Sequence, residues 1–465
     1  MNRCERWARE EFGDAVLDDE RRVARLVTLA GDAAARPAGT VTRVCRSSAG
    51  REGAFRWLEN RDIATEPVAA ASHRASLRRC GTDAVVYVPI DGTTLTLTDT
   101  MDRKELGGVG TWSQRARGVQ VVSALAVRLD GTPLGVCGQS MWLRAHRVHV
   151  RHIARSGDLA NRETGHLVRL LWRTNDAFIA QAPGTKPWFQ IDRGGDCWPI
   201  LGLAQMKEML LTVRAAHDRC LRDEQHRYLW KKVMSRPVIG HHKVDVPARP
   251  ARTKHGGHPA QPARSAKLSL RVARVCIEAS TEGMGKVLID VNAVLAREVG
   301  HKGDALEWML LTTHPVKNVA DAVAVLAGYT QRWRIEEFHR TWKRGLCRVE
   351  DTQLRSREAI FKWATILGAV ASRAMRLAHL GRNSSQSPAT EELSAEEIDA
   401  LIVLRKPPRI ARGYAPTMGE AVRWLAELGG YTGKSSGGPP GATVIGRGLQ
   451  DLAVVTEALK NLNKM

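Results

Sequence analysis

An uninterrupted apolar segment, AVVYVPI at residues 84–90, places the strongest constraint on the fold of this chain. The segment is rich in β-branched residues, and it therefore predicts a central strand that is buried on both faces. Two further strand patterns follow it, VQVVSALAV at 119–127 and PLGVC at 133–137. Asp130-Gly131 lies between these two patterns and is typical of a hairpin turn. The middle of the chain is therefore expected to be a mixed α/β core.

Helical patterns flank this core on both sides. The acidic run 18–20 precedes apolar residues at helical spacing, which predicts a capped helix. A second helical stretch is expected at 52–58, another at 161–181, and a long helical region over about 317–380. Linker-like compositions at 382–390 and 433–443 separate short helices towards the C-terminus. The chain therefore consists of a central α/β region between two helical regions.

The second half of the core contains more strands. Residues 188–191 predict a short strand that ends at Asp192, and strands are also expected near 268–280, 286–298 and 307–313. Residues 244–266 are rich in Pro, Ala, Arg, His and Gly without a hydrophobic period, and they predict a loop within an inserted segment.

The charge balance indicates the kind of partner. The 465 residues include 70 Lys and Arg against 49 Asp and Glu, which gives a formal net charge of +21. A protein this basic is expected to bind a polyanion, with DNA or RNA as first candidates, although a solvated basic surface is the alternative. No apolar run reaches the roughly 18–20 residues of a membrane helix, and the charged N-terminus does not resemble a signal peptide. The 8 cysteines form no CxxC pair, which favours reduced thiols in a cytoplasmic protein.

Two aspartates stand at strand ends, where ligands bind in α/β sheets. Asp91 follows the apolar run 84–90, and Asp192 follows WFQI and precedes Arg-Gly-Gly-Asp. Glycines at 194 and 195 would let the backbone approach a phosphate or a metal. The alternative for both aspartates is an ordinary turn, with Asp196 as a cap. Carboxylates that converge on two divalent ions are what two-metal phosphodiester cleavage requires.

The segment YTQRWRIEEFHRTWKR at 329–344 carries the most specific pattern. On a continuous helix, Tyr329, Arg332, Glu336 and Lys343 fall within about 60° of one another. Ile335, Phe338 and Trp342 lie on the opposite side and predict an apolar anchor. A carboxylate can bind metal while Arg and Lys hold phosphate, but a salt-bridged amphipathic helix is the alternative.

Two other readings have less support. His241, His242, His255 and His258 lie in an irregular basic stretch without a Cys or acidic partner at ligand spacing, so a metal site there is not favoured. Tyr329 could serve as a recombinase nucleophile, but its neighbours on the helix suit metal and phosphate binding better.

The same segment contains Tyr-x2-Arg-x3-Glu-x6-Lys and resembles the signature of bacterial DDE transposases of the insertion-sequence-four family. The transposon-five type is similar in particular, and further segments in the same order include EGAFRW at 52–57, NAVLARE at 292–298 and LEWMLLTT at 306–313. The resemblance covers most of the chain and is weakest beyond about 380.

The resemblance implies a role for individual residues. Asp91, Asp192 and Glu336 would be the catalytic carboxylates and would bind two Mg²⁺ ions, with Mn²⁺ as a substitute. The phosphate-contacting and DNA-contacting residues would be Tyr329, Arg332, Lys343, Trp308, Arg21, Arg22 and Arg25. Trp308 would stack on a flipped base, although a core position is the alternative. Without the resemblance, the three arginines would be a solvated face.

The resemblance also implies an architecture. It predicts an N-terminal helical domain at 1–75 that binds DNA ends, an RNase H-like catalytic core at 76–380 with a β-rich insertion at about 200–300, and a helical C-terminal region at 381–465 for dimerisation. The implied function is cut-and-paste transposition by a homodimer acting on double-stranded DNA, both transposon ends and target. The alternatives are a catalytically inactive, transposase-derived DNA-binding or inhibitory protein, and a structure-specific nuclease with the same core.

Overall fold

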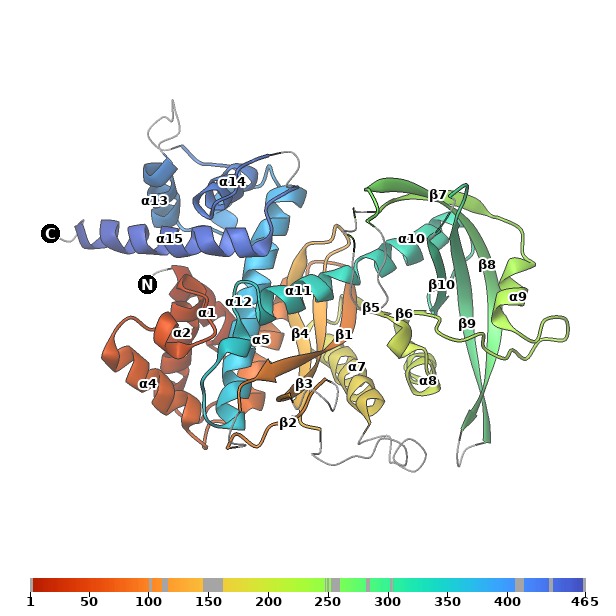
Figure 1. Cartoon of the computed structure of the whole chain (residues 1–465), viewed down its shortest axis with the longest axis horizontal. Helices are drawn as coiled ribbons and strands as arrows, with labels where there is room; N and C mark the ends of the chain where they lie inside the picture. Colours follow the sequence, from red (N-terminus) through yellow and green to blue (C-terminus); the bar gives the residue numbers. More distant parts are fainter. Residues whose placement is uncertain are drawn as a thin grey trace. The chain divides into compact units, whose positions relative to one another are not determined.

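The computed structural model describes residues 3–462 except 100–102, 111–115, 145–161, 247, 249–250, 252–259, 282–284, 302, 304, 406–413 and 435–437. The chain divides into two compact units (Figure 1). Unit 1 consists of Met1–Lys186 and Trp333–Met465, and unit 2 consists of Pro187–Arg332. No helix among the described residues is long and apolar enough to cross a membrane.

Unit 1 begins with helices, as the sequence predicts. They are α1 (Arg3–Phe12), α2 (Glu20–Ala35), α3 (Val41–Val44), α4 (Ser48–Glu59) and α5 (Thr65–Cys80). Asp19 is the N-cap of α2, because its side chain accepts a hydrogen bond from the backbone N–H of Arg21. The acidic run before the apolar spacing was therefore a correct sign of a helix start.

The sheet of unit 1 is antiparallel. β1 (Val85–Leu97) and β4 (Pro133–Trp142) both pair with β3 (Arg117–Val127), and β2 (Gly107–Gly108) pairs with the start of β3. The predicted hairpin turn at Asp130-Gly131 is confirmed, since Gly131 has φ 89° and the Asp130 carboxylate accepts the N–H of Thr132. The helix α7 (Glu163–Gln181) packs on β3 and β4.

β1 continues beyond the predicted strand. Asp91 pairs with Ser123, and the ladder extends to Leu97 opposite Arg117. The prediction that Asp91 ends the strand was therefore wrong, and the pairing with β3 is the reason, because it gives partners to backbone groups that a turn would expose. Asp91 instead projects from the interior of a strand.

One long helix organises the rest of unit 1. α12 (Arg357–Asn383) packs against α2, α4, α5, β4 and α11 (Trp333–Lys343), and most of its residues are buried. Even the Lys362 side chain is enclosed, and its Nζ donates to the carbonyls of Asn60 and Ile63 at 2.8 and 3.0 Å. A helix buried on all sides needs neighbours on all sides, so α12 is the central element of this unit.

The C-terminal helices form a cluster of their own in unit 1. α13 (Ala395–Arg405), α14 (Met418–Leu428) and α15 (Ala442–Leu462) share a buried core with the end of α12. α15 spans 21 residues and is longer than the short helices expected there. The predicted boundaries at 75/76 and 380/381 fall inside α5 and α12 and stay predictions.

Unit 2 is a mixed sheet. β5 (Lys186–Ile191) and β6 (Leu210–Arg214) are parallel, and β10 (Glu307–Thr312), β9 (Gly285–Glu298), β8 (Arg264–Thr281) and β7 (Gly240–Val246) follow as antiparallel neighbours. The helices of this unit are α8 (Trp198–Met206), α9 (Leu229–Met234) and α10 (Val319–Thr330). The loop prediction for 244–266 was wrong at both ends, because Val244 pairs with Ala266 in the β7–β8 ladder.

The helical region over 329–344 is interrupted. α10 ends at Thr330 and α11 begins at Trp333, and between them the Arg332 N–H donates to the carbonyl of Tyr329 instead of continuing the i→i−4 series. The continuous helical wheel that grouped Tyr329 and Arg332 with Glu336 was therefore wrong. The break also coincides with the boundary between the two units.

Candidate active site

The apolar anchor of α11 is confirmed and determines which side of the helix faces the core of unit 1. Ile335, Phe338 and Trp342 are fully buried, and the last two rings stack with their centroids 5.7 Å apart. The indole Nε1 of Trp342 donates to the carbonyl of Ala364 on α12 at 3.0 Å. These contacts hold α11 in a defined rotation about its axis.

Lys343 connects α11 to β1. Its Nζ donates to Oγ1 of Thr93 at 3.1 Å and lies 3.7 Å from a carboxylate oxygen of Glu350. The same carboxylate accepts the N–H of Thr96 at 2.9 Å and pairs with Arg344 at 2.8 Å. Glu350 thus joins the end of β1 to the segment that follows α11.

These contacts also join the helix of Glu336 to the strand of Asp91. Lys343 meets Thr93 and Glu350 meets Thr96, so residues 343–350 run beside residues 93–96 in the same direction. Glu336 shares the Lys343 side of the helix, and Asp91 shares with Thr93, two residues further along β1, the face of the strand that Lys343 contacts. Both carboxylates are only partly buried.

A neighbouring glutamate has a structural role instead. Glu337 accepts from His379 of α12 at 3.3 Å and pairs with Arg334, whose Nε donates to the carbonyl of Gly131 at 3.2 Å. Burial opposes ionisation of Glu337, but His379 and Arg334 outweigh it and hold the pKa of this carboxyl below its ordinary value. Of two adjacent glutamates, one anchors α11 and the other lies on the Lys343 side.

Unit 2 contains the remaining predicted residues. Ile191 pairs with Val213 in parallel register, so the next residues, Asp192 and Arg214, leave the carboxyl ends of adjacent strands. The Asp192 carboxylate accepts the N–H of Gly194 at 2.8 Å and caps the short turn that follows. Asp192 is therefore both a turn residue, as the alternative held, and a strand-end acid.

Asp196, the second aspartate of this motif, is committed to the fold. Its side chain is 0% exposed and accepts from the N–H groups of Ala216 and His217 and from Nε of Arg219. Gly195 is also structural, since a Cβ there would lie 2.6 Å from Cγ2 of Ile191. Close packing on β5, rather than approach to a phosphate, is the reason for this glycine.

An aromatic and cationic group lies beside the end of β6. The rings of Trp308 and Tyr329 meet edge to face with centroids 5.6 Å apart, and the Arg332 guanidinium lies 5.9 Å from the Tyr329 centroid. Burial raises the pKa of Tyr329, and contacts with Arg332 and Arg214 oppose the rise only in part. The phenol therefore stays protonated at neutral pH and can donate a hydrogen bond, which disfavours a nucleophilic role.

Arg214 is a candidate site residue that the sequence patterns did not predict. It stands at the end of LLTVR, one strand away from Asp192, and its Nη2 donates to the carbonyl of Glu307 at 3.1 Å. A strand-end position beside a candidate acid was the available signal. The register with β5 and the contact with Tyr329 became visible only in the structure.

The N-terminal arginines have separate environments on α2. Arg21 is 92% exposed and pairs with Asp19 at 2.9 Å. Arg22 donates to the carbonyl of Leu17 and to Asp62, and Arg25 packs over Gly53 of α4. Arg21 projects furthest into solvent.

The carboxylates suit a hard divalent cation in chemistry. Carboxylate oxygens are the ligands that Mg²⁺ and Mn²⁺ prefer. No group of three or more His, Cys, Asp or Glu side chains at ligand distance occurs in the described part of the chain. Asp91 and Glu336 belong to unit 1 and Asp192 belongs to unit 2, so neither unit contains the predicted triad alone. His241 and His242 lie on alternate faces of β7, and His255 and His258 lie outside the described residues.

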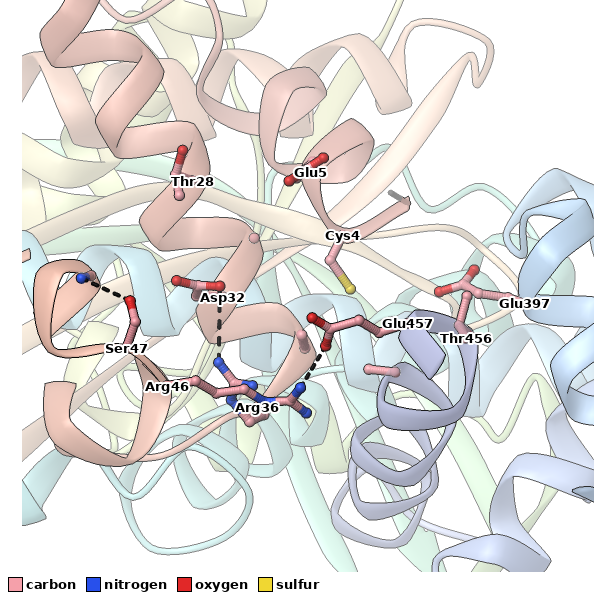
Figure 2. Close-up of a pocket in the computed structure, with 14 residues that line it drawn as sticks. Cys4, Glu5, Thr28, Asp32, Arg36, Arg46, Ser47, Glu397, Thr456 and Glu457 are labelled. Atoms are coloured by element: carbon pink, nitrogen blue, oxygen red, sulfur yellow. Dashed lines mark hydrogen bonds and ion pairs between the residues drawn. The ribbon is translucent and has the colours of Figure 1, made fainter. Parts of the chain in front are cut away.

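A cavity of about 420 Å³ lies elsewhere in unit 1 (Figure 2). It is lined by residues of the N-terminal and C-terminal helices, and the pairs Arg36–Asp32 and Arg46–Glu457 border it. Burial and the charge of Glu5 raise the pKa of Asp32. None of the predicted catalytic residues lines this cavity.

The fold is RNase H-like, with a mixed sheet and flanking helices. The candidate acids Asp91, Asp192 and Glu336 lie on a strand, after a strand and on a helix. This fold is that of the DDE enzymes. Three family models match the chain and agree with this class. They are Transposase DNA-binding at residues 4–63, Transposase DDE domain at 161–372 and Transposase Tn5 dimerisation domain at 369–463. The chain belongs to the DDE transposases of the Tn5 type. DNA is accordingly its partner, and a homodimer its expected assembly.

Proposed function

We propose that this DNA transposase moves its element by a cut-and-paste route. The N-terminal helices bind the terminal inverted repeats, and Asp91, Asp192 and Glu336 hold two Mg²⁺ ions, which Mn²⁺ can replace. Bound ions would activate water and the 3′-hydroxyl as nucleophiles and stabilise the leaving oxygen. The contact between Lys343 and Thr93 supports this proposal, because it joins the helix of Glu336 to the strand of Asp91 within unit 1.

The other residues of the site act on phosphate and base. Lys343 offers a point charge to a phosphate that approaches β1, while Arg332 and Arg214 offer planar guanidinium groups. Tyr329 donates a hydrogen bond through a phenol that remains protonated. The half-buried Trp308 presents an aromatic face for stacking a flipped base. Cleavage, hairpin formation and strand transfer then reuse one set of carboxylates.

Glu336→Gln tests this proposal. The full-length protein is incubated with Mg²⁺ and a plasmid bearing the inverted repeats that flank its gene, and nicks and hairpins are resolved on denaturing gels. We expect Glu336→Gln to lose detectable cleavage while binding the ends normally, because an amide cannot replace a carboxylate as an anionic metal ligand. Asp176→Asn, an exposed carboxylate of α7, is the matched control and should cleave normally.

The outcomes separate the alternatives. Cleavage retained by Glu336→Gln would contradict the assignment of Glu336 as a catalytic metal ligand. Binding without nicking by the unmodified protein would favour an inactive, transposase-derived DNA-binding protein. Cleavage that is indifferent to the end sequence would indicate a structure-specific nuclease.

A further inference from the structure

The outer strands of unit 2 place basic side chains in one plane. His241 of β7 lies opposite Ser269 of β8, which in turn lies opposite Arg297 of β9. Two positions along the ladder, Lys243 lies directly opposite Lys267. Residues directly opposite in an antiparallel sheet point to the same side, and so do alternate residues of one strand. These four basic residues therefore share one face, which we call the basic face, and the exposed Asp245, opposite Ser265, is an acidic residue on the same face.

The basic face is not the face that carries the aromatic group. Glu307 lies opposite Arg297, whereas Trp308 lies opposite Ala296, so Trp308 projects to the other side of the sheet. The two helices lie on different faces of the sheet. Trp230 of α9 donates to Glu307 on the basic face, whereas Val319 of α10 packs against Gly240 on the face of Trp308. Figure 1 shows α9 and α10 on the two sides of the β8–β9 ribbon.

Lys243 and Lys267 are the unusual members of the basic face. Both are exposed, and among the residues that the structure describes neither has an ion pair. Like charges directly opposite in a sheet repel and lower its stability. A single lysine on an edge strand such as β7 can discourage edge pairing, but that role does not explain a second lysine opposite it on the inner strand β8.

More positive charge surrounds this pair. Arg271 is two residues from Ser269 on the same side of β8, and its Nε donates to the carbonyl of Arg236 at 3.0 Å. Lys231 of α9 is exposed, and so is Arg236, which follows this helix. Among the residues that the structure describes, Arg297 is the one member of the basic face that pairs with an acidic side chain, that of Glu307 at 3.4 Å. An anionic ligand would relieve the repulsion that the sheet itself leaves in place.

We propose that the basic face binds the phosphate backbone of duplex DNA, with Lys243 and Lys267 as its centre. Lysine ammonium groups act on phosphates as point charges without reading sequence, so this surface adds affinity and not base specificity. The basic face would bind DNA on the side of the sheet opposite Trp308 and Tyr329. The inference rests on the proposed function only in taking DNA as the partner.

The salt dependence of binding tests the proposal. Full-length protein in EDTA binds a mixed-sequence duplex between about 50 and 200 mM salt, and the slope of log affinity against log salt is measured. Each lost phosphate contact should reduce the slope by about 0.9, so Lys243→Gln with Lys267→Gln should reduce it by about 1.8. Lys286→Gln is the matched control, because Lys286 lies on the same hairpin and pairs with Glu278 at 2.7 Å. An unchanged slope in the double variant would overturn the proposal.

A charge reversal separates binding from folding. Lys267→Glu places a carboxylate opposite Lys243, so the unfolding midpoint should stay equal or rise while DNA affinity falls. Weaker binding that accompanies a lower midpoint in this variant would overturn the proposal, as would a loss of duplex RNA binding with DNA binding unchanged. The assay contains no cleavage step, so its failure is independent of any failure of Glu336→Gln.

Discussion

The two units hold their parts of the candidate site by different forces. In unit 1, α11 is held mainly by apolar packing, with Phe338 and Trp342 fully buried against α12. In unit 2, buried carboxylates organise the loops, as Asp196 does for residues 216–219. Apolar packing is nearly independent of pH and tolerates conservative replacements, whereas a buried carboxylate network fails when one member is removed.

This difference affects how precisely each unit can present a functional group. A helix packed on a core keeps its rotation through many weak contacts, so Glu336 stays on the Lys343 side even if one contact is lost. A turn such as 192–195 depends on a few hydrogen bonds and on close packing at Gly195. We therefore expect single substitutions in this turn of unit 2 to lower the free energy of unfolding more than substitutions of similar size in α11.

The largest effect is expected at Asp196. Asp196→Ala leaves Arg219 and two backbone N–H groups without their acceptor, which should lower the free energy of unfolding by about 3 kcal/mol. Asp192→Ala removes one turn hydrogen bond and should cost about 1 kcal/mol or less. Urea denaturation of both variants measures the contrast. Equal losses at the two aspartates would contradict the division between a structural and a functional acid.

A smaller loss is expected at Gly195. The new Cβ of Gly195→Ala would lie 2.6 Å from Ile191 and 3.3 Å from Val213, so overpacking should cost about 1–3 kcal/mol. Gly202→Ala in α8 has open space at its Cβ and should stabilise the protein by up to about 1 kcal/mol. Thermal unfolding of the two variants should thus shift in opposite directions. A neutral Gly195→Ala would show that β5 and its turn are loosely packed.

The smallest expected effect is a change in stability at low pH. The hydrogen bond from Arg264 lowers the pKa of Glu298 to about 2, from an ordinary value of 4.5. Because the folded pKa is depressed, the stability that this pair contributes is present above pH 4.5 and is lost as the pH falls towards 2. Glu298→Gln should lower stability at neutral pH and match the unmodified protein near pH 2. A difference that persists unchanged at low pH would contradict this linkage.

Short-range patterns predicted much of the fold. The apolar run 84–90, the hairpin turn at Asp130-Gly131 and the anchor on α11 were all read correctly from spacing. The candidate acids were selected by their resemblance to a family, because a strand-end aspartate is common in any sheet. The position of α11, the helix of Glu336, beside β1 then depended on contacts that no local pattern contains, such as the one between Lys343 and Thr93.

The amino-acid sequence by itself determined the local elements, the basic charge and the family of this protein. These follow from hydrophobic periods, turn residues and a motif, all of which act over a few neighbouring residues. Only the tertiary structure decided that the helical pattern breaks after Thr330, that Asp196 is buried while Asp192 is not, and that Lys243 faces Lys267. Each of these depends on strand register or on packing between distant segments, and a one-residue change in register would move every side chain of a strand to the other face.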